Sequence, residues 1–94
     1  LTQKAIGHIF NAQKYYGGKK YAQALSEIQS SLDTKETAGA YVVQGSIYYA
    51  LGRRQAALTA YRSALSIDPT LRDVKTLVKS LESQLSIPAE KETE

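Results

Sequence analysis

The sequence contains no cysteine and no methionine, and it has a single histidine, His8. Without cysteine the chain can form no disulfide, no thiolate metal site and no thiol nucleophile, although the redox compartment stays open. With no second histidine a zinc site has too few of its usual ligands, and position implies no Ser-His-Asp set. These absences predict a protein that is not an enzyme and that needs no metal or other cofactor.

Long apolar runs are also missing. No stretch approaches the roughly 20 apolar residues that a membrane-spanning helix needs. Gly17-Gly18 is not followed by the lysine-serine or lysine-threonine of a phosphate-binding loop. The chain begins at Leu1 and lacks methionine throughout, which indicates a piece of a longer protein. Any signal peptide, lipid anchor or further repeat would lie outside it, so the sequence leaves the cellular location open.

What the chain does contain suits one small folded domain. A length of 94 residues is too short for a second independent core, and a hydrophobic content of 43% is ordinary for a globular protein. The exception is the segment 88–94, which has three glutamates and no core residue. That composition predicts a disordered acidic tail, with residues 1–87 forming the domain.

An internal repeat is the main positive signal. When the sequence is shifted by 33 places along itself, identical residues coincide without a gap. The identical pairs are Ala5 with Ala38, Tyr15 with Tyr48, Tyr16 with Tyr49, Ala24 with Ala57, Leu25 with Leu58, Ser30 with Ser63, and Leu32 with Leu65. Repeats of 20–50 residues are typical of solenoids, whose stacked units offer an extended binding surface.

Apolar spacing and turn residues predict five helices, over about 2–16, 20–32, 37–51, 54–67 and 70–86. Gly17-Gly18 and Gly52 are expected to end the first and third helices, because glycine readily takes the left-handed conformation. Asp68-Pro69 is expected to end the fourth helix and to begin the fifth, since proline suits a first helical turn. The fifth helix has one apolar and one polar face, as expected for a helix that closes an array.

Small residues recur where paired helices would approach closely, and large residues recur between them. The small positions are Gly45, Ala57 and Ala64 in the second repeat, and Ala12 and Ala24 in the first. The large residues expected to fill the spaces are Tyr15, Leu25, Ile28, Leu32, Tyr48, Leu58, Tyr61 and Leu65. Tyr48, Tyr61, Ala57 and Leu65 are therefore interpreted as packing residues, and His8, at a packing position, as a structural histidine.

The second repeat resembles the tetratricopeptide repeat family in its aromatic, small and proline positions. The matching residues are Tyr41, Gly45, Tyr48, Ala57, Tyr61 and Pro69, while Gln44 departs from the family's leucine. The first repeat is more degenerate, with His8 at the place of Tyr41 and Glu36 at that of Pro69. The resemblance implies an all-α fold: an antiparallel helix-pair superhelix, or TPR-like α-α solenoid, of five helices. Repeat one would cover about 5–37, repeat two about 38–71, and a capping helix about 70–86.

Members of that family generally act as non-enzymatic adaptors that hold a peptide or extended segment in a concave groove. For this chain, whose groove would be largely apolar, the expected ligand is a peptide or helix of a partner protein. The first helix of each repeat would line this groove. The resemblance implies these groove residues: Ile6, Ile9, Phe10, Gln13, Tyr16, Val42, Val43, Ser46 and Tyr49, with Gly39 and Ala50 beside them. Because this set holds no lysine or arginine, it does not suit the carboxylate grip of the family's chaperone-binding branch. Phe10, Tyr16, Val43 and Tyr49 are the favoured ligand contacts.

Two other functions stay open. Two repeats are fewer than the three that such arrays usually need. The apolar groove residues could equally cover one another, a neighbouring repeat or a second copy of the chain, which would make the module a self-association element. Equivalent turns also carry a basic edge, formed by Lys19, Lys20, Arg53 and Arg54. Such an edge can attract acidic protein, anionic lipid or nucleic acid, although no nucleic-acid motif accompanies it and lysines in turns usually serve solubility.

Overall fold

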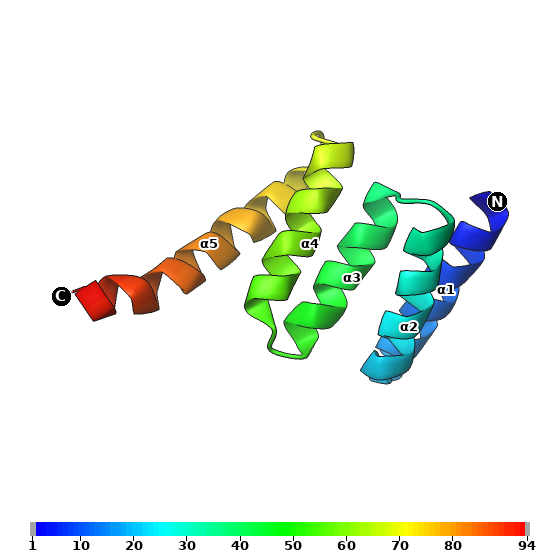
Figure 1. Ribbon diagram of the computed structural model, residues 1–94, viewed down its shortest axis with the longest axis horizontal. Coiled ribbons are helices and arrows are strands. Elements are labelled where there is room, and N and C mark those ends of the chain that lie inside the picture. The colour runs from blue at the N-terminus through cyan, green and yellow to red at the C-terminus, as the bar shows by residue number, and fades with distance from the viewer. Residues whose placement is uncertain (1, 94) are drawn as a thin grey trace.

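The computed structural model describes the backbone of residues 2–93 and the side chains of residue 4 and residues 6–85. Five helices follow one another along the chain (Figure 1). They are α1 (Thr2–Gly17), α2 (Tyr21–Thr34), α3 (Ala38–Ala50), α4 (Arg54–Ile67) and α5 (Arg72–Thr93). The described backbone holds no strand. The prediction of an all-α protein with five helices is therefore confirmed.

The helices form an array of antiparallel pairs. In Figure 1, α1 lies against α2 and α3 lies against α4, while α5 starts beside the end of α4 and then diverges from it. The first pair meets the second mainly through α2 and α3, with a smaller contact between α1 and α3. The chain termini lie at opposite ends of this array, whose extents are 50 × 28 × 19 Å. This is helix-on-helix packing repeated along one direction.

Two clusters of buried side chains hold the array together. The first joins α1, α2 and α3, and consists of Ala12, Ala24, Ile28, Leu32, Ala40 and Ile47. The second joins α4 and α5, and consists of Ala57, Leu58, Tyr61, Ala64, Val74, Val78 and Leu81. Tyr41 packs against both clusters, so the core is continuous along the array. Among the small residues of the two clusters, Ala12, Ala24, Ala57 and Ala64 are predicted close-contact positions, whereas Ala40 is not.

Gly45 shows why one of those positions needs the smallest residue. The ring of Tyr61 lies over it, so that a Cβ atom built on Gly45 would come within 2.7 Å of the ring carbon Cε1. Tyr61 is itself 3% exposed and has little space into which to move. Glycine at position 45 therefore lets a bulky ring of α4 pack directly on the backbone of α3.

The turn inside each repeat has nearly the same backbone conformation. Lys20 precedes α2 with φ −92° and ψ 71°, and Arg53 precedes α4 with φ −90° and ψ 74°. The Lys20 N–H donates to the carbonyl of Tyr15 at 2.8 Å, and the Arg53 N–H donates to the carbonyl of Tyr48 at 2.9 Å. The equivalence at 33 residues thus extends from the sequence to the backbone.

The structure corrects the predicted end of the first helix. The left-handed residue in that turn is Lys19, with φ 60°, rather than Gly17 or Gly18. The reason is the repeat register, because Lys19 corresponds to Gly52, which has φ 79° in the second repeat. The helix accordingly continues through Gly17, and the first repeat places a lysine where the second has the favoured glycine.

The start of the fifth helix also differs from the prediction. Pro69 and Thr70 form a turn, and α5 begins only at Arg72. The Asp68 carboxylate accepts hydrogen bonds from the Thr70 N–H at 3.0 Å and from its hydroxyl at 2.5 Å. These bonds lower the pKa of Asp68. They hold the chain in a local turn that competes with an immediate helix start.

The far end of α5 lies beyond the predicted limit near residue 86, because the helix ends at Thr93. Proline has a φ that helical backbone tolerates and removes one hydrogen bond, so Pro88 disfavours continuation without forbidding it. The side chains after residue 85 lie outside the described residues. The disordered acidic tail at 88–94 and the domain limits 1–87 therefore stay predictions.

One face of α5 is polar where the equivalent face of α3 is packed. A step of 34 residues takes Tyr41 to Lys75, Gly45 to Lys79, and Tyr48 to Glu82. In α3 these places contact other helices, whereas in α5 all of them are exposed. Glu82 instead pairs with Arg62 of α4 at 2.5 Å. The adjacent side of α5 buries Val74, Val78 and Leu81 against the second cluster, as expected of a capping helix.

Candidate partner-binding surface

The predicted groove residues lie on α1 and α3, and we call this set the α1–α3 face. Its members on α1 are spaced so that Ile6, Phe10 and Gln13 lie along one side of the helix. Val42, Val43, Ser46 and Tyr49 share a side of α3 in the same way. The two helices contact each other directly.

The structure divides the α1–α3 face into exposed and half-buried residues. Ile6, Phe10, Tyr16 and Tyr49 are 59%, 67%, 38% and 45% exposed, and Gln13 is exposed as well. Ile9 and Val43 are half-buried against the first cluster, and Val42 is half-buried against the second. The half-buried residues therefore form a floor that belongs to the core, and the exposed ones stand above it.

A pair of hydroxyl groups lies where α3 meets α4. The hydroxyls of Ser46 and Tyr61 lie 3.0 Å apart, and Ser46 donates its proton to the carbonyl of Val42 at 3.1 Å. Since Ser46 has only one proton, Tyr61 is the donor between the two hydroxyls. Burial is the largest cause that raises the pKa of Tyr61; the bond with Ser46 lowers it, and Tyr16 and Tyr49 have smaller effects that raise it.

The two tyrosines that raise the pKa of Tyr61 come from two other helices. Tyr16 belongs to α1, Tyr49 to α3 and Tyr61 to α4, and each of the first two is close enough to affect the ionisation of Tyr61. The ring of Tyr16 also meets that of Tyr21 edge to face, with centroids 5.8 Å apart. Sequence reasoning assigned Tyr61 to packing alone, whereas its hydroxyl also bonds to that of Ser46.

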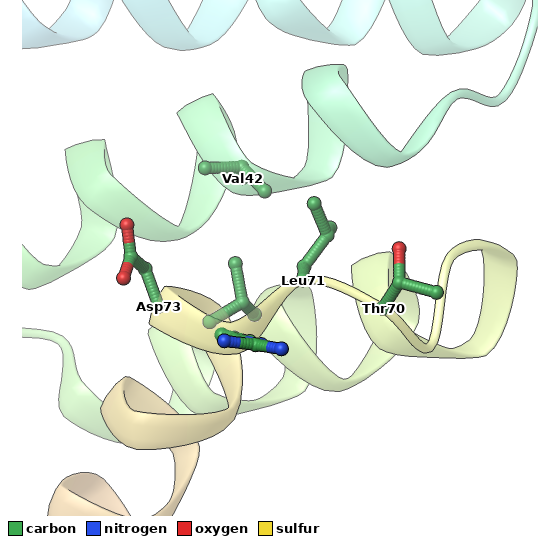
Figure 2. Close-up of a pocket in the computed structure, with 6 residues that line it drawn as sticks. Val42, Thr70, Leu71 and Asp73 are labelled. Atoms are coloured by element: carbon green, nitrogen blue, oxygen red, sulfur yellow. The ribbon is translucent and has the colours of Figure 1, made fainter.

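A pocket lies at the end of the face next to α5. It has a volume of about 390 Å³ and is lined by Val42, Thr70, Leu71, Arg72, Asp73 and Val74. Figure 2 shows the Val42 side chain on one side and Leu71 on the other, with the Asp73 carboxylate and Thr70 at opposite ends. Sequence reasoning found Val42 but missed the residues in and just before α5, because it treated α5 only as a cap. A shift of 34 residues along the sequence places Asp73 at the position of Gly39, and this equivalence could have predicted that the start of α5 lines the groove.

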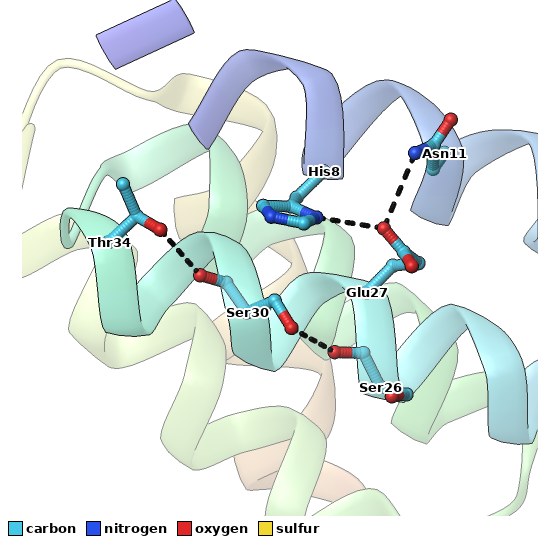
Figure 3. Close-up of polar contacts among 6 residues, drawn as sticks. All are labelled: His8, Asn11, Ser26, Glu27, Ser30 and Thr34. Atoms are coloured by element: carbon cyan, nitrogen blue, oxygen red, sulfur yellow. Dashed lines mark hydrogen bonds and ion pairs between the residues drawn. The ribbon is translucent and has the colours of Figure 1, made fainter. Parts of the chain in front are cut away.

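His8 is engaged with α2 rather than with the face. Its Nδ1 lies 2.8 Å from Oε1 of Glu27, and the side-chain amide of Asn11 donates to the same oxygen at 3.3 Å (Figure 3). The bonds from His8 and then Asn11 lower the pKa of Glu27. His8 thus ties α1 to α2, in agreement with a structural role. Within the described part of the chain, no three histidines or carboxylates gather as metal ligands would.

The basic edge consists of exposed residues at one side of the array. Lys19 and Lys20 lie in the turn between α1 and α2, and Arg53 and Arg54 lie at the turn between α3 and α4. Figure 1 shows these two turns on the same side of the molecule. Neither α2 nor α4 has a side-chain cap at this end. The two turns with their four positive charges therefore lie at one side of the array, and a function for this basic edge stays a prediction.

Comparison with known families agrees with this architecture. Residues 38–71 match the family model of the tetratricopeptide repeat. This match, together with the five helices, fits a TPR-like repeat domain. Repeats of this family generally mediate protein–protein interaction and are non-enzymatic modules that bind protein partners. The matched segment coincides with the predicted second repeat, while the first rests on the 33-residue equivalence and the shared turn geometry.

No curated protein matches the chain. Over the described residues, none of the helices is both long enough and apolar enough to cross a membrane.

Proposed function

We propose that the protein is an interaction module that binds a peptide or helical segment of a partner protein on the α1–α3 face. The observation that carries this proposal is the exposure of large apolar side chains on that face. Phe10 and Ile6 on α1 are more than half exposed, and Tyr16 and Tyr49 are more than one third exposed. Grouped exposed apolar residues on a small protein mark interaction surfaces.

The binding free energy that these exposed side chains could contribute suits a docking site. Full burial of one large apolar side chain stabilises a complex by about 1.5–3 kcal/mol. Aromatic residues tend to dominate protein interfaces, because they bury a large area at a modest cost in conformational entropy. Phe10 and Tyr49 are therefore proposed as the main anchors, above a floor of Ile9, Val42 and Val43.

The charge of the face restricts the ligand. Its described residues on α1 and α3 include no lysine and no arginine, so a carboxylate would find no cationic partner there. A ligand bound through a charged terminus is therefore disfavoured. A segment that contributes apolar side chains fits better.

A selection from a displayed random 12-residue peptide library tests this function. Peptides recovered on the wild-type chain should bind Phe10→Asp at least about tenfold more weakly, since a charged side chain would replace a buried anchor. Ile67→Asp is the matched control, because Ile67 is 46% exposed but lies on α4, which contributes none of the predicted groove residues. Equal loss in both variants, or in neither, would contradict the proposal.

Self-association is the second candidate function, favoured by the same exposed residues. A second copy could cover Phe10 and Ile6 as well as a foreign segment could, and the arrays of this kind usually hold more than two repeats. In that case Phe10→Asp would lower the molar mass in solution. The basic edge offers a third, electrostatic route, for which Arg53→Glu and a steep loss of affinity with salt would be the signature.

A further inference from the structure

The basic edge differs from the opposite side of the array in carrying charges of one sign only. Residues 1–26 and 37–67, which include both turns of this edge, contain no aspartate and no glutamate. The turns at the opposite side mix the two signs, because at and beside them lie Asp33, Lys35, Glu36, Asp68, Arg72 and Asp73. A surface that served solubility alone would mix signs at both sides. Its charge therefore suits the basic edge to an anionic partner.

The backbone of Lys19 supplies a second observation. This exposed residue has φ 60°, and the equivalent Gly52 has φ 79°. A residue with a Cβ is strained in the left-handed conformation, whereas glycine is not. Residues held in such conformations cluster at functional sites, where the side chain is needed for something other than stability. The first repeat thus keeps a positive charge at a position where glycine would favour the fold.

Large apolar side chains accompany the positive charges at this edge. Leu51 lies in the turn between α3 and α4 and is 40% exposed. Tyr16 and Tyr49 lie in the last turns of α1 and α3. Their carbonyls accept hydrogen bonds, each at 3.0 Å, from the N–H groups of the left-handed residues Lys19 and Gly52. Tyrosine and leucine beside lysine and arginine are typical of protein surfaces that meet the boundary between lipid and water.

A lipid bilayer fits this combination better than a nucleic acid or an acidic peptide. The charges lie on two separate turns at one side of the array, and a flat anionic surface can contact both at the same time. A single-stranded nucleic acid would stack its bases on exposed rings, but the ring of Tyr16 already meets that of Tyr21 edge to face. Neither a phosphate backbone nor an acidic side chain would cover Leu51, whereas the acyl region of a bilayer would.

We propose that the basic edge docks the protein on a membrane surface that contains anionic lipid. Its four basic side chains lie against the headgroups, and Leu51 enters the boundary between the headgroups and the acyl chains. This edge lies at one end of each of the helices α1 to α4, so the helices lead away from the bilayer and the α1–α3 face stays open to a partner protein. Because the two surfaces are different, this inference and the proposed function can fail separately.

Co-sedimentation of the chain with lipid vesicles tests this inference. The vesicles consist of phosphatidylcholine with about one third phosphatidylserine, and vesicles of phosphatidylcholine alone are the neutral reference. The wild type should bind only the anionic vesicles. Arg53→Gln should weaken this binding about fivefold, which is the effect of one positive charge near an anionic surface. Lys79→Gln is the matched control, since Lys79 is exposed on α5, which takes no part in the basic edge.

Lys19→Gly separates a loss of binding from damage to the fold. It removes one positive charge and should weaken vesicle binding about fivefold. Its thermal unfolding midpoint should rise, because glycine relieves the strain at φ 60°. A variant that is more stable and yet binds less cannot have lost binding by unfolding.

Leu51→Ser tests the apolar part of the contact without changing charge. It should weaken binding to the anionic vesicles at least about threefold, since one apolar side chain no longer leaves water. Ile67→Ser is its matched control, because Ile67 is 46% exposed but lies at the other end of α4 from the basic edge.

The expected result is binding to the anionic vesicles alone, which weakens as salt is raised from about 0.15 M to about 1 M and the charges are screened. No binding to either kind of vesicle, or equal binding to both, would overturn the inference. Binding that Arg53→Gln and Lys19→Gly leave unchanged would do the same. Binding of polyuridylate RNA or polyglutamate, with no binding to vesicles, would also overturn it and assign the edge to a different anionic partner.

Discussion

The two repeats share a backbone but differ in what packs against it. At one position the first repeat has His8, which bonds to Glu27 across to α2, and the second has Tyr41, which packs on both core clusters. At another the first repeat buries Ser31 where the second buries Ala64. The turns nevertheless agree within a few degrees at Lys20 and Arg53. Polar pairs and small substitutions can thus replace apolar packing without altering the path of the chain.

The largest expected effect tests the closest packing in the second repeat. Gly45→Ala should destabilise the protein by about 1–3 kcal/mol, because its Cβ would overlap the buried ring of Tyr61. The equivalent place in the first repeat is Ala12, which faces the smaller Ile28 across the 33-residue register. Urea unfolding followed by circular dichroism measures the loss.

The first repeat suggests a rescue for that variant. Tyr61→Ile should restore part of the stability lost in Gly45→Ala, since it recreates the alanine and isoleucine combination of the first repeat. The two changes must then be less destabilising together than their sum. Strict additivity, or no loss in Gly45→Ala alone, would show that the ring does not limit this position.

The next prediction compares the two turns, where substitutions should change the stability of the protein in opposite directions. Gly52→Ala should cost about 1–2 kcal/mol, because a residue with a Cβ is strained at φ 79° while no other group stands near it. Lys19→Gly should instead stabilise the protein by up to about 1 kcal/mol, because glycine relieves the backbone strain of lysine at φ 60°. The gain stays small because glycine also gives the unfolded chain more conformational freedom. Thermal unfolding of both variants is the measurement. A loss of stability in Lys19→Gly would contradict the shared turn geometry.

A smaller effect concerns the ion pair that joins α4 to α5. Arg62 and Glu82 lie 2.5 Å apart, with their side chains 54% and 46% exposed. Because water screens exposed pairs, Arg62→Ala should lower stability by only about 0.2–1 kcal/mol. The loss should shrink in 1 M salt, in which exposed charges are screened within a few ångströms. A larger loss that salt does not change would assign Arg62 a packing role.

The smallest expected effect is the acid dependence of the first repeat. The pKa of Glu27 is lowered from its ordinary 4.5 by the bonds from His8 and Asn11, so the folded state binds fewer protons than the unfolded state in that range. Its contribution is therefore complete above pH 4.5 and is lost as pH falls through the lowered value. Glu27→Gln should flatten this part of a plot of urea midpoint against pH.

Asp68 serves as the reference in the second repeat. Its pKa is also lowered, from 3.8, by the bonds from Thr70, so Asp68→Asn should act at lower pH than Glu27→Gln. An identical acid profile for the two variants would mean that neither carboxylate contributes separately.

Much of this fold could be predicted because both the 33-residue repeat and the helical spacing of apolar residues are clear in the sequence. The 33-residue repeat and the apolar spacing located all five helices, with every end within a few residues except the far end of the fifth, and small residues such as Ala24 and Ala57 marked the buried contacts. The errors came from local backbone choices. Glycine preference pointed to Gly17-Gly18 as the left-handed site, but the register of the repeat placed it at Lys19. Proline preference placed the fifth helix too early, because the bonds between Asp68 and Thr70 were not visible in a pattern.

The candidate site was predictable in its helices and less so in its details. Family resemblance proposed nine residues, and the structure shows Phe10, Ile6, Tyr16 and Tyr49 exposed while Ile9, Val42 and Val43 are half-buried. Periodicity could not separate these groups, since an exposed and a buried apolar residue look alike in sequence. The pocket beside α5 depends on how Leu71 and Val74 meet Val42, which only tertiary packing determines.

The most direct test of the central claim is the molar mass of the chain by sedimentation equilibrium over a hundredfold range of concentration, for the wild type and Phe10→Asp. An exposed α1–α3 face that is available to a partner protein predicts a constant mass of 10.3 kDa for the wild type. A wild-type mass that rises toward twice this value, with Phe10→Asp remaining monomeric, would contradict the claim and show that a second copy covers the face.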